Sequence, residues 1–378
     1  MYIGIDAHKL SESICVTDDA GTIVEEYKME NTQENWNGFM NRYGRECTEI
    51  AVESSTSGKY VARLLRDSGF KIHLTNPKEL KMIFRSNAYK NDAMILAKLL
   101  RTGDLPESYL PSKEIDELRT AIRYRRSLGE ELSIRNKVHA ILAMHGIRIE
   151  ASDIFGKRSL NRILESSDKL PEMDRIILTD LISRFNDLSM RIEKLQDKIA
   201  SLGNSIEEVK TLMTIPGIDY YTAIAIYSEI GDIKRFPDAE HLSSYTGLVP
   251  RVDQSGENAI YGHITKSGPS LLRYFIVNSV HTLIKLSPTF KTIYRKLKKR
   301  IGRYRSIIAV ARKLAVVIYN MLEKKKEFVE EHAFKALKER KLKNMESRSK
   351  RPHGFSRDEM ETVIKEAVIS SKSNKLLS

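Results

Sequence analysis

The chain has 378 residues, of which 41% are hydrophobic and 30% charged, and its formal net charge at pH 7 is +13. This composition is ordinary for a globular protein, and the length is enough for two or three domains. Residues 285–378 contain 26 Lys and Arg against 10 Asp and Glu, whereas the residues before them have a net charge of −3. A basic end of this kind indicates a polyanionic partner, either nucleic acid or an anionic membrane surface, unless it is only a solvated helix and tail.

Cysteine content and hydropathy indicate the cellular compartment of the protein and whether it crosses a membrane. Two isolated cysteines, Cys15 and Cys47, exclude a disulfide framework and favour a reduced, cytoplasmic compartment. The sequence opens on a strand-like segment and shows no charged-then-apolar signal peptide. The most apolar late segment, residues 306–322, contains Arg312 and Lys313, which predicts a buried or amphipathic helix and not a membrane span. We therefore expect a cytoplasmic protein with no membrane partner.

The first hundred residues predict an α/β domain. Short apolar runs predict strands at residues 2–6, 13–17, 22–27, 49–53 and 71–74. Helical periodicity and capping residues predict helices over residues 33–43, 58–68 and 91–101. The first three strands are expected to form an antiparallel meander. Three strands, then helix, strand, helix, strand and helix, together with the acid placement described below, predict a ribonuclease-H-like domain at residues 1–110.

Residues 111–210 are predicted to form a helical coiled-coil linker. Apolar residues recur at helical spacing among charged residues over 118–142 and again over 173–212. The polar segment 150–170 between these two stretches is expected to be a loop region. Two long charged helices joined in this way predict an antiparallel coiled-coil arm, which would serve as a spacer or as a dimer contact.

Residues 211–325 are predicted to form a mostly helical domain, followed by a basic tail at 326–378. Ile215-Pro216-Gly217-Ile218 separates two helical stretches and looks like a helix–hairpin–helix element. In such an element the turn at Gly217 would offer backbone amides to a phosphate. A plain interhelical turn explains the same tetrapeptide equally well. The Lys-, Arg- and Ser-rich residues 341–375 are expected to be disordered.

Three acidic residues stand at the ends of predicted elements. Asp6 and Glu53 end strands, and Asp92 begins a helix. In a ribonuclease-H-like sheet these positions converge, and carboxylates there would hold Mg²⁺ or Mn²⁺ ions that neutralise charge during attack on a phosphodiester. Any one of these acids alone is better explained as a solvated strand-end residue. The three together predict a metal site.

A second group of candidate residues lies in the glycine-rich segment 245–273. Arg251, Lys266 and Arg273 stand among small residues there, an arrangement that suits an approaching anion such as a nucleic-acid backbone. Ser255 would be a nucleophile if its environment eased the loss of its proton. From the residues alone it is one loop serine among many, most of which only cap or hydrogen-bond.

The order of these motifs carries a resemblance to a known family. The matching pieces are Ile3-Gly4-Ile5-Asp6, Val52-Glu53, Asp92-Ala93, Ile215-Pro216-Gly217-Ile218, Tyr245-Thr246-Gly247-Leu248-Val249-Pro250, Ser255-Gly256 and Thr265-Lys266-Ser267-Gly268. In this order, to about residue 325, the chain resembles the IS110 family of insertion-sequence transposases, whose relatives include pilin-gene invertases. The resemblance implies a RuvC-like domain, a coiled-coil linker and a small C-terminal transposase domain.

The resemblance also implies a mechanism and partners. It implies that Ser255 is the DNA nucleophile, assisted by a metal on Asp6, Glu53 and Asp92. It further implies homodimers that assemble into tetramers on donor and target DNA. A structured non-coding bridge RNA would guide the reaction by base pairing, while the protein reads shape and backbone.

One position departs from the family pattern. The family has a third acid three residues before the last one, and Tyr89 stands at that place in this chain. A phenol is a poorer ligand for Mg²⁺ than a carboxylate. Three interpretations remain open: a site with three acids, substitution by another residue such as Asp104 or His8, or a catalytically impaired copy that binds RNA and DNA without recombining them. A RuvC-type nuclease that hydrolyses DNA with water is a further alternative, in which Ser255 has no catalytic role.

Overall fold

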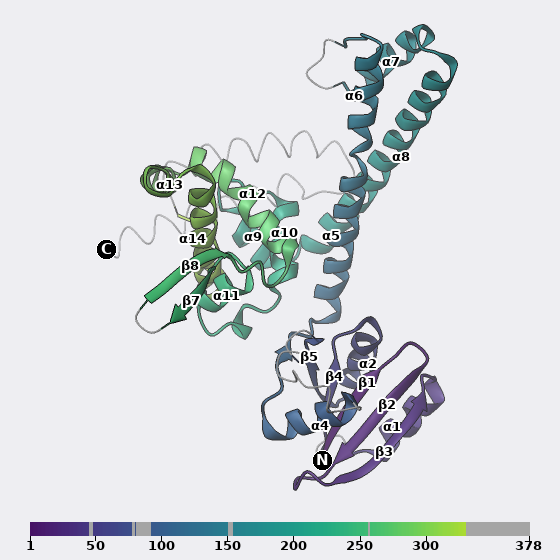
Figure 1. Ribbon diagram of the computed structural model, residues 1–378, viewed down its shortest axis with the longest axis vertical. Coiled ribbons are helices and arrows are strands. Elements are labelled where there is room, and N and C mark those ends of the chain that lie inside the picture. The colour runs from purple at the N-terminus through teal and green to yellow at the C-terminus, as the bar shows by residue number, and fades with distance from the viewer. Residues whose placement is uncertain (45–47, 78–79, 81–91, 150–153, 256–257, 330–378) are drawn as a thin grey trace. The chain divides into compact units, whose positions relative to one another are not determined.

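The computed structural model describes residues 1–44, 48–77, 80, 92–149, 154–255 and 258–329 (Figure 1). The chain divides into two compact units, one ending at Ser112 and the other beginning at Lys113. The predicted boundary after residue 110 lies close to this division. The further split into a linker and a C-terminal domain stays a prediction.

The first unit is built on a six-stranded mixed sheet with the strand order β3-β2-β1-β4-β5-β6. The strands are β1 (Tyr2–Ala7), β2 (Ser11–Thr17), β3 (Ile23–Glu30), β4 (Glu49–Glu53), β5 (Lys71–Thr75) and β6 (Glu107–Ser108). The first three strands form the predicted antiparallel meander, and β4 and β5 continue the sheet in parallel with β1. Because β1 and β4 are parallel and adjacent, their carboxyl ends meet at one edge of the sheet.

Helices cover both faces of this sheet. The helices of this unit are α1 (Gln33–Arg42), α2 (Thr56–Asp67) and α4 (Asp92–Thr102). Alternation along β4 separates the faces, since Ile50 and Val52 pack with the core of α1 and α2 whereas Ala51 packs with α4. The architecture is a mixed α/β layer compatible with a DEDD nuclease-like fold; the finer RuvC-like assignment stays a prediction.

The second unit begins with long helices that pack along one another. They are α5 (Lys113–Glu131), α6 (Ile134–Met144), α7 (Lys157–Ser166) and α8 (Glu172–Gly203). Both α5 and α6 pack on α8 through a shared apolar core (Figure 1). The expectation of a loop over residues 150–170 was wrong for most of that segment, because α7 and a 3-10 turn (Ser167–Lys169) occupy it. Leu160 and Ile163 of α7 are buried in the core of α6 and α8, which stabilises a short helix in a polar sequence. The supercoiled geometry of a coiled coil stays a prediction.

The residues that the structure describes after α8 form a helical body with one β-hairpin. Its helices are α9 (Glu207–Met213), α10 (Tyr220–Ile230), α11 (Ala239–Tyr245), α12 (Ser270–Leu286), α13 (Pro288–Ile301) and α14 (Arg303–Lys324), with a 3-10 turn (Ile233–Arg235) after α10. Leu118 and Ile122 of α5 and Ile199 of α8 belong to the core of this body. Among the residues that the structure describes, no helix combines the length and the apolar composition that a membrane crossing needs.

Candidate active site

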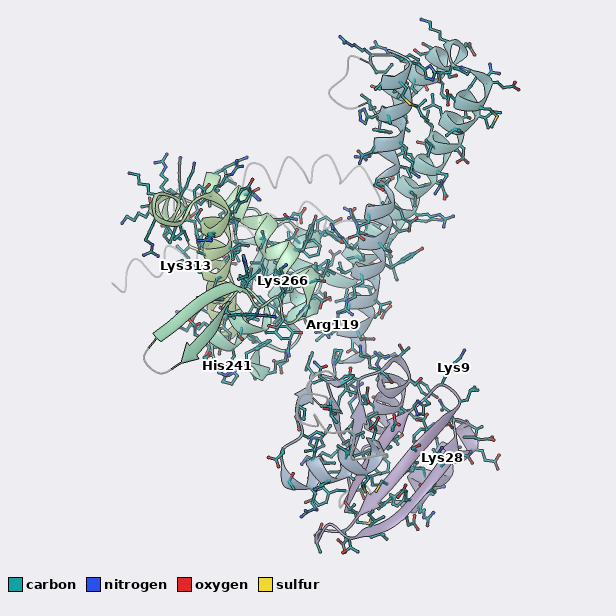
Figure 2. All side chains as sticks on the ribbon, in the orientation of Figure 1. Lys9, Lys28, Arg119, His241, Lys266 and Lys313 are labelled. Carbon is teal, nitrogen blue, oxygen red and sulfur yellow. The ribbon has the colours of Figure 1, made fainter. Side chains whose placement is uncertain are left out.

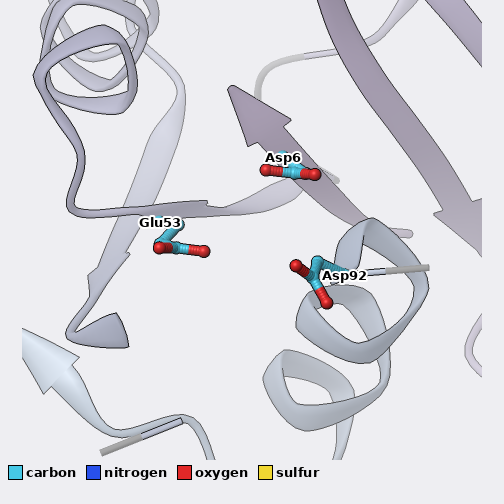
Figure 3. A group of neighbouring side chains, drawn as sticks. All are labelled: Asp6, Glu53 and Asp92. Atoms are coloured by element: carbon cyan, nitrogen blue, oxygen red, sulfur yellow. The ribbon is translucent and has the colours of Figure 1, made fainter. Parts of the chain in front are cut away.

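The three predicted carboxylates converge in the structure. Asp6 lies near the end of β1, Glu53 is the last residue of β4, and Asp92 is the first residue of α4. One carboxylate oxygen of each lies within 4.8 Å of those of the other two, and Figure 3 shows the side chains gathered around one space. The register of the parallel strands explains why Asp6 and Glu53 are neighbours. Ile5 pairs with Val52, so the next residue of each strand lies beside the next residue of the other.

Two glycines bring the backbone close enough to form this cluster. A Cβ atom on Gly4 would lie 1.9 Å from the carbonyl oxygen of Ala93 and 2.6 Å from the amide nitrogen of Ala97. Helix α4 therefore rests directly on the backbone of β1, which places Asp92 beside Asp6. A Cβ atom on Gly58 would lie 1.9 Å from the carbonyl oxygen of Glu53, so only glycine permits the tight turn from β4 into α2. Backbone approach, more than side-chain packing, positions the three acids.

The electrostatics of the cluster centre on Asp6. Burial raises the pKa of the Asp6 carboxyl, the neighbouring His8 opposes this effect, and the negative charge of Asp92 adds to it. The Nε2 atom of His8 lies 3.3 Å from an Asp6 carboxylate oxygen, so His8 stands at the margin of the cluster. His8 was one of the two residues suggested to compensate for the missing acid, and the structure places it in contact with Asp6.

A fourth carboxylate, which the sequence reasoning missed, lies nearby. Glu12 on β2 is completely buried, and its carboxylate oxygens make no hydrogen bond to the described residues. Burial and the charge of Asp6 raise its pKa from 4.5 to about 7. The signal was present in the sequence, since Glu12 shares the inward-facing alternation of Ile14 and Val16. A charged residue at an inward position of a strand is rare and marks a special environment.

The donor set fits a hard divalent cation. Three carboxylates from separate elements offer anionic oxygens within a short span, and both Mg²⁺ and Mn²⁺ accept such ligands. Three neighbouring negative charges repel one another in the absence of a cation. The charge of Asp92 adds to the raised pKa of Asp6, of which burial is the largest cause. Asp6, Glu53 and Asp92 are the residues that would hold the metal.

Tyr89 and Asp104 were both considered in connection with the missing third acid. Tyr89 lies outside the described residues. Asp104 follows the C-terminal end of α4, at the opposite end of that helix from Asp92. Since a helix rises about 1.5 Å per residue, the length of α4 separates the two by roughly 15 Å, and the suggestion that Asp104 replaces the missing acid was wrong.

Ser255 lies on a strand and not in a loop. It is the last residue of β7 (Pro250–Ser255), which pairs with β8 (Asn258–Ile264) in an antiparallel hairpin where Ser255 faces Asn258. The structure describes its backbone only. The expectation that this segment is a loop was wrong, because alternating apolar residues such as Val252 and Ile260 support a hairpin around a short polar turn. Ser255 therefore stands at the tip of the hairpin.

The three predicted cationic residues stand near the base of the same hairpin, in different roles. Arg251 on β7 and Lys266 after β8 are exposed, and Figure 2 labels Lys266. Arg273 on α12 is half-buried and donates through Nη1 to the carbonyl oxygens of Thr246, at 3.0 Å, and Ser267, at 3.2 Å. Burial lowers its pKa. Arg273 thus fixes the two loops that carry the hairpin, whereas Arg251 and Lys266 are open to an anionic partner.

Gly217 lies in the turn between α9 and α10, as the helix–hairpin–helix prediction requires. Its φ of +90° favours glycine, and a Cβ atom would lie 2.7 Å from Cβ of Thr282 on α12. The N-terminus of α10 is capped by Asp219, which accepts a hydrogen bond from the amide of Thr222 at 2.8 Å. A phosphate at this turn would therefore use the amides before Thr222.

Comparisons with known proteins identify the family of this chain. The sheet order and the carboxylate cluster are compatible with a DEDD nuclease-like fold. A family model described as "Transposase", named for the DEDD transposases of IS110, matches residues 3–147, and the model "Transposase IS116/IS110/IS902 family" matches residues 209–295. Together the two models cover more than half of the chain. The chain belongs to the IS110 family of transposases, which confirms the resemblance found in the sequence.

Relatives match over most of their length. The transposase for insertion sequence element IS1111A of Coxiella burnetii is 23% identical, over 86% of this chain and 90% of that protein. The transposase for insertion sequence element IS1328 of Yersinia enterocolitica is 28% identical, over 60% of this chain and 68% of that protein. The pilin gene-inverting protein of Moraxella bovis is 26% identical, over 86% of this chain and 97% of that protein.

Proposed function

We propose that this transposase is a recombinase that cuts and rejoins DNA through Ser255, assisted by a divalent metal on Asp6, Glu53 and Asp92. The observation that carries the proposal is the convergence of the three carboxylates within 4.8 Å in a chain of this family. When bound there, the cation supplies charge neutralisation at the phosphate. The alternative of a nuclease that hydrolyses DNA with water would use the carboxylates and would not use Ser255.

The proposed reaction conserves the energy of the phosphodiester. The Oγ atom of Ser255 forms a bond to phosphorus as the bond from phosphorus to the 3′ oxygen breaks. The serine proton leaves to solvent or a carboxylate, and the 3′ oxygen takes up a proton and departs as a hydroxyl. Attack on the phosphoserine by the 3′-hydroxyl of another strand reverses these steps, restores the serine and needs no ATP.

The proposal also assigns the rest of the chain. Residues 1–110 form the RuvC-like domain, 111–210 the coiled-coil linker, 211–325 the C-terminal transposase domain and 326–378 a basic tail. Arg251, Lys266 and the turn at Gly217 contact nucleic-acid backbone, and Arg273 holds the loops that present Ser255. The carboxylates and the serine act on one phosphate across the subunits of a dimer that pairs into a tetramer. A bridge RNA selects donor and target DNA in the cytoplasm.

Ser255→Ala tests the serine. We expect loss of strand exchange and of the covalent protein–DNA adduct, with RNA and DNA binding unchanged because the substitution removes a single oxygen. Ser267→Ala, in the neighbouring loop, is the matched control and should keep the adduct. DNA cleavage by the Ser255→Ala protein that leaves a free 5′-phosphate would identify a water-using nuclease instead. Sequencing RNA that copurifies with the protein tests guidance, and a discrete RNA encoded beside the gene is the expected result.

Tyr89 supports a second candidate, a family member that binds RNA and DNA but does not recombine. Under the first proposal the natural protein is active, and Tyr89→Asp raises metal-dependent activity by adding a ligand. Tyr89→Phe is the matched control, since it changes the phenol without adding charge. Recombination that appears only in the Tyr89→Asp protein would favour the impaired member.

A further inference from the structure

A large groove lies on the helical body of the second unit. Its volume is about 1430 Å³, and its walls come from β8, α13, α14 and the residues after α14. The floor is apolar and includes Phe290, Ile293, Leu297, Ile308 and Val317. An apolar floor of this size on the surface of a protein calls for a covering partner.

The rim of the groove is basic. Arg300, Arg305, Arg312 and Lys313 line it, and Figure 2 labels Lys313 on α14. Arg312 has a carboxylate neighbour, since its Nη2 atom lies 3.7 Å from Glu240. Within the described ranges the other three cations form no ion pair. The occupant should therefore combine an apolar face with acidic side chains.

The chain itself leads into this groove. Phe328 and Val329, the last described residues, line it, and Val329 is 66% exposed. The following residues, 330–357, contain 9 Lys and Arg against 4 Asp and Glu. Residues 358–369 reverse this balance, with 4 Asp and Glu against 1 Lys. An acidic stretch of the basic tail thus follows a linker that begins at the groove.

The acidic stretch also has a suitable pattern. Met360, Val363, Ile364, Ala367 and Val368 are spaced as the apolar face of a helix. We propose that residues 358–369 dock in the groove as an amphipathic helix, with these side chains on the apolar floor and the acidic side chains toward the rim. The 28 residues 330–357 reach up to about 90 Å when extended, so the segment can return to the groove of its own chain.

The observations favour this occupant over two others. A nucleic-acid backbone would match the rim but leave the apolar floor uncovered. A second copy could insert the same segment, but tethering gives the segment of the same chain an effective concentration of about millimolar, which exceeds that of a second copy at micromolar protein. The docking does not depend on the proposed recombination, so it can hold or fail independently of Ser255.

Cysteine crosslinking of the full chain tests the docking. Leu297→Cys on α13 combined with Val363→Cys should form a disulfide on mild oxidation at micromolar protein, and the product should have the mass of one chain. Leu297→Cys with Thr362→Cys is the matched control, because Thr362 lies on the opposite side of the predicted helix. Equal rates for the two pairs, or a product with the mass of two chains, would overturn the proposal. A chain with Leu297→Cys alone shows whether the introduced cysteine forms a disulfide with the natural Cys15 or Cys47.

Hydrogen exchange of the full chain gives a second measurement that does not need a crosslink. Val363→Asp should speed amide exchange in α13 and the first half of α14 by about tenfold, which corresponds to about 1.4 kcal/mol of lost local stability. Thr362→Asp adds the same charge on the opposite face and should leave exchange unchanged. Identical exchange in the two variants and in the natural chain would show that the segment does not cover the groove. Protection that appears only when duplex DNA is added would assign the groove to nucleic acid and refute the proposal.

Discussion

Replacing the buried Glu12 by glutamine should make the first unit more stable at alkaline pH. Its pKa in the folded protein is about 7, against 4.5 for an ordinary glutamate. The folded state therefore holds this proton more tightly than the unfolded state does. Stability from this group is complete below about pH 4.5 and is lost as the pH rises toward 7. The difference between the two pKa values corresponds to about 3 kcal/mol, and Glu12→Gln should recover that amount at pH 8 but almost none at pH 4.5.

The chain contains a convenient probe for this measurement. Its single tryptophan, Trp36, is fully buried in the core of the first unit, so its fluorescence reports unfolding of that unit. Urea unfolding of Glu12→Gln and the natural chain, with chelator present, should give curves that diverge between pH 5 and pH 8. Glu30→Gln, on the exposed side of the neighbouring strand β3, is the matched control. Parallel curves for Glu12→Gln and the natural chain would refute the assigned pKa.

The same measurement connects Glu12 to the metal. Because the charge of Asp6 is one cause of the raised pKa, a cation bound to Asp6 should lower it. Mg²⁺ added in place of chelator should therefore shrink the stability gain of Glu12→Gln at pH 8. A gain that is the same with and without Mg²⁺ would mean that no cation binds near Asp6 at the concentration used.

Three further predictions concern packing, an ion pair and metal binding. Gly4→Ala should destabilise the first unit by about 1–3 kcal/mol in urea unfolding because its Cβ meets the backbone of α4, whereas Gly38→Ala, with open space around it, should stabilise by up to about 1 kcal/mol. Arg123→Ala should cost the second unit about 1–3 kcal/mol, because it removes the bidentate partner of Glu229 on α10, whose side chain is 1% exposed. Arg191→Ala, which breaks an exposed ion pair with Asp187, should cost less than about 0.5 kcal/mol. Asp92→Asn should weaken Mn²⁺ binding at least about tenfold by calorimetry, and unchanged binding would remove this residue from the ligand set.

Much of the first unit could be predicted because its signals are local. Strands alternate, helices begin at capping residues such as Thr32 and Ser55, and parallel strands bring Asp6 and Glu53 to one edge. Sequence reasoning therefore found all three acids of the cluster. It did not find Glu12, because the predicted strand began at residue 13 and left this inward-facing position outside it.

The second unit was harder to predict for the same kind of reason. Helix α7 occurs in polar sequence that local preference assigns to a loop, and its buried contacts with α6 and α8 decide its conformation. The β7–β8 hairpin depends on pairing between two short strands across a polar turn. The role of Arg273 depends on two carbonyl oxygens that are distant in the sequence. A cationic residue in a glycine-rich segment fits both an anion site and an internal brace, and the structure shows the brace.

The close backbone approaches at Gly4 and Gly58 bear on how copies of a mobile element lose activity. Any side chain at either position would collide with a carbonyl oxygen only 1.9 Å from its first carbon. A copy with such a change would keep every acid and the serine, yet the acids would no longer meet. A survey of insertion sequences that scores only the reactive residues would count that copy as intact. A copy should therefore be scored as active only if it keeps glycine at both of these positions.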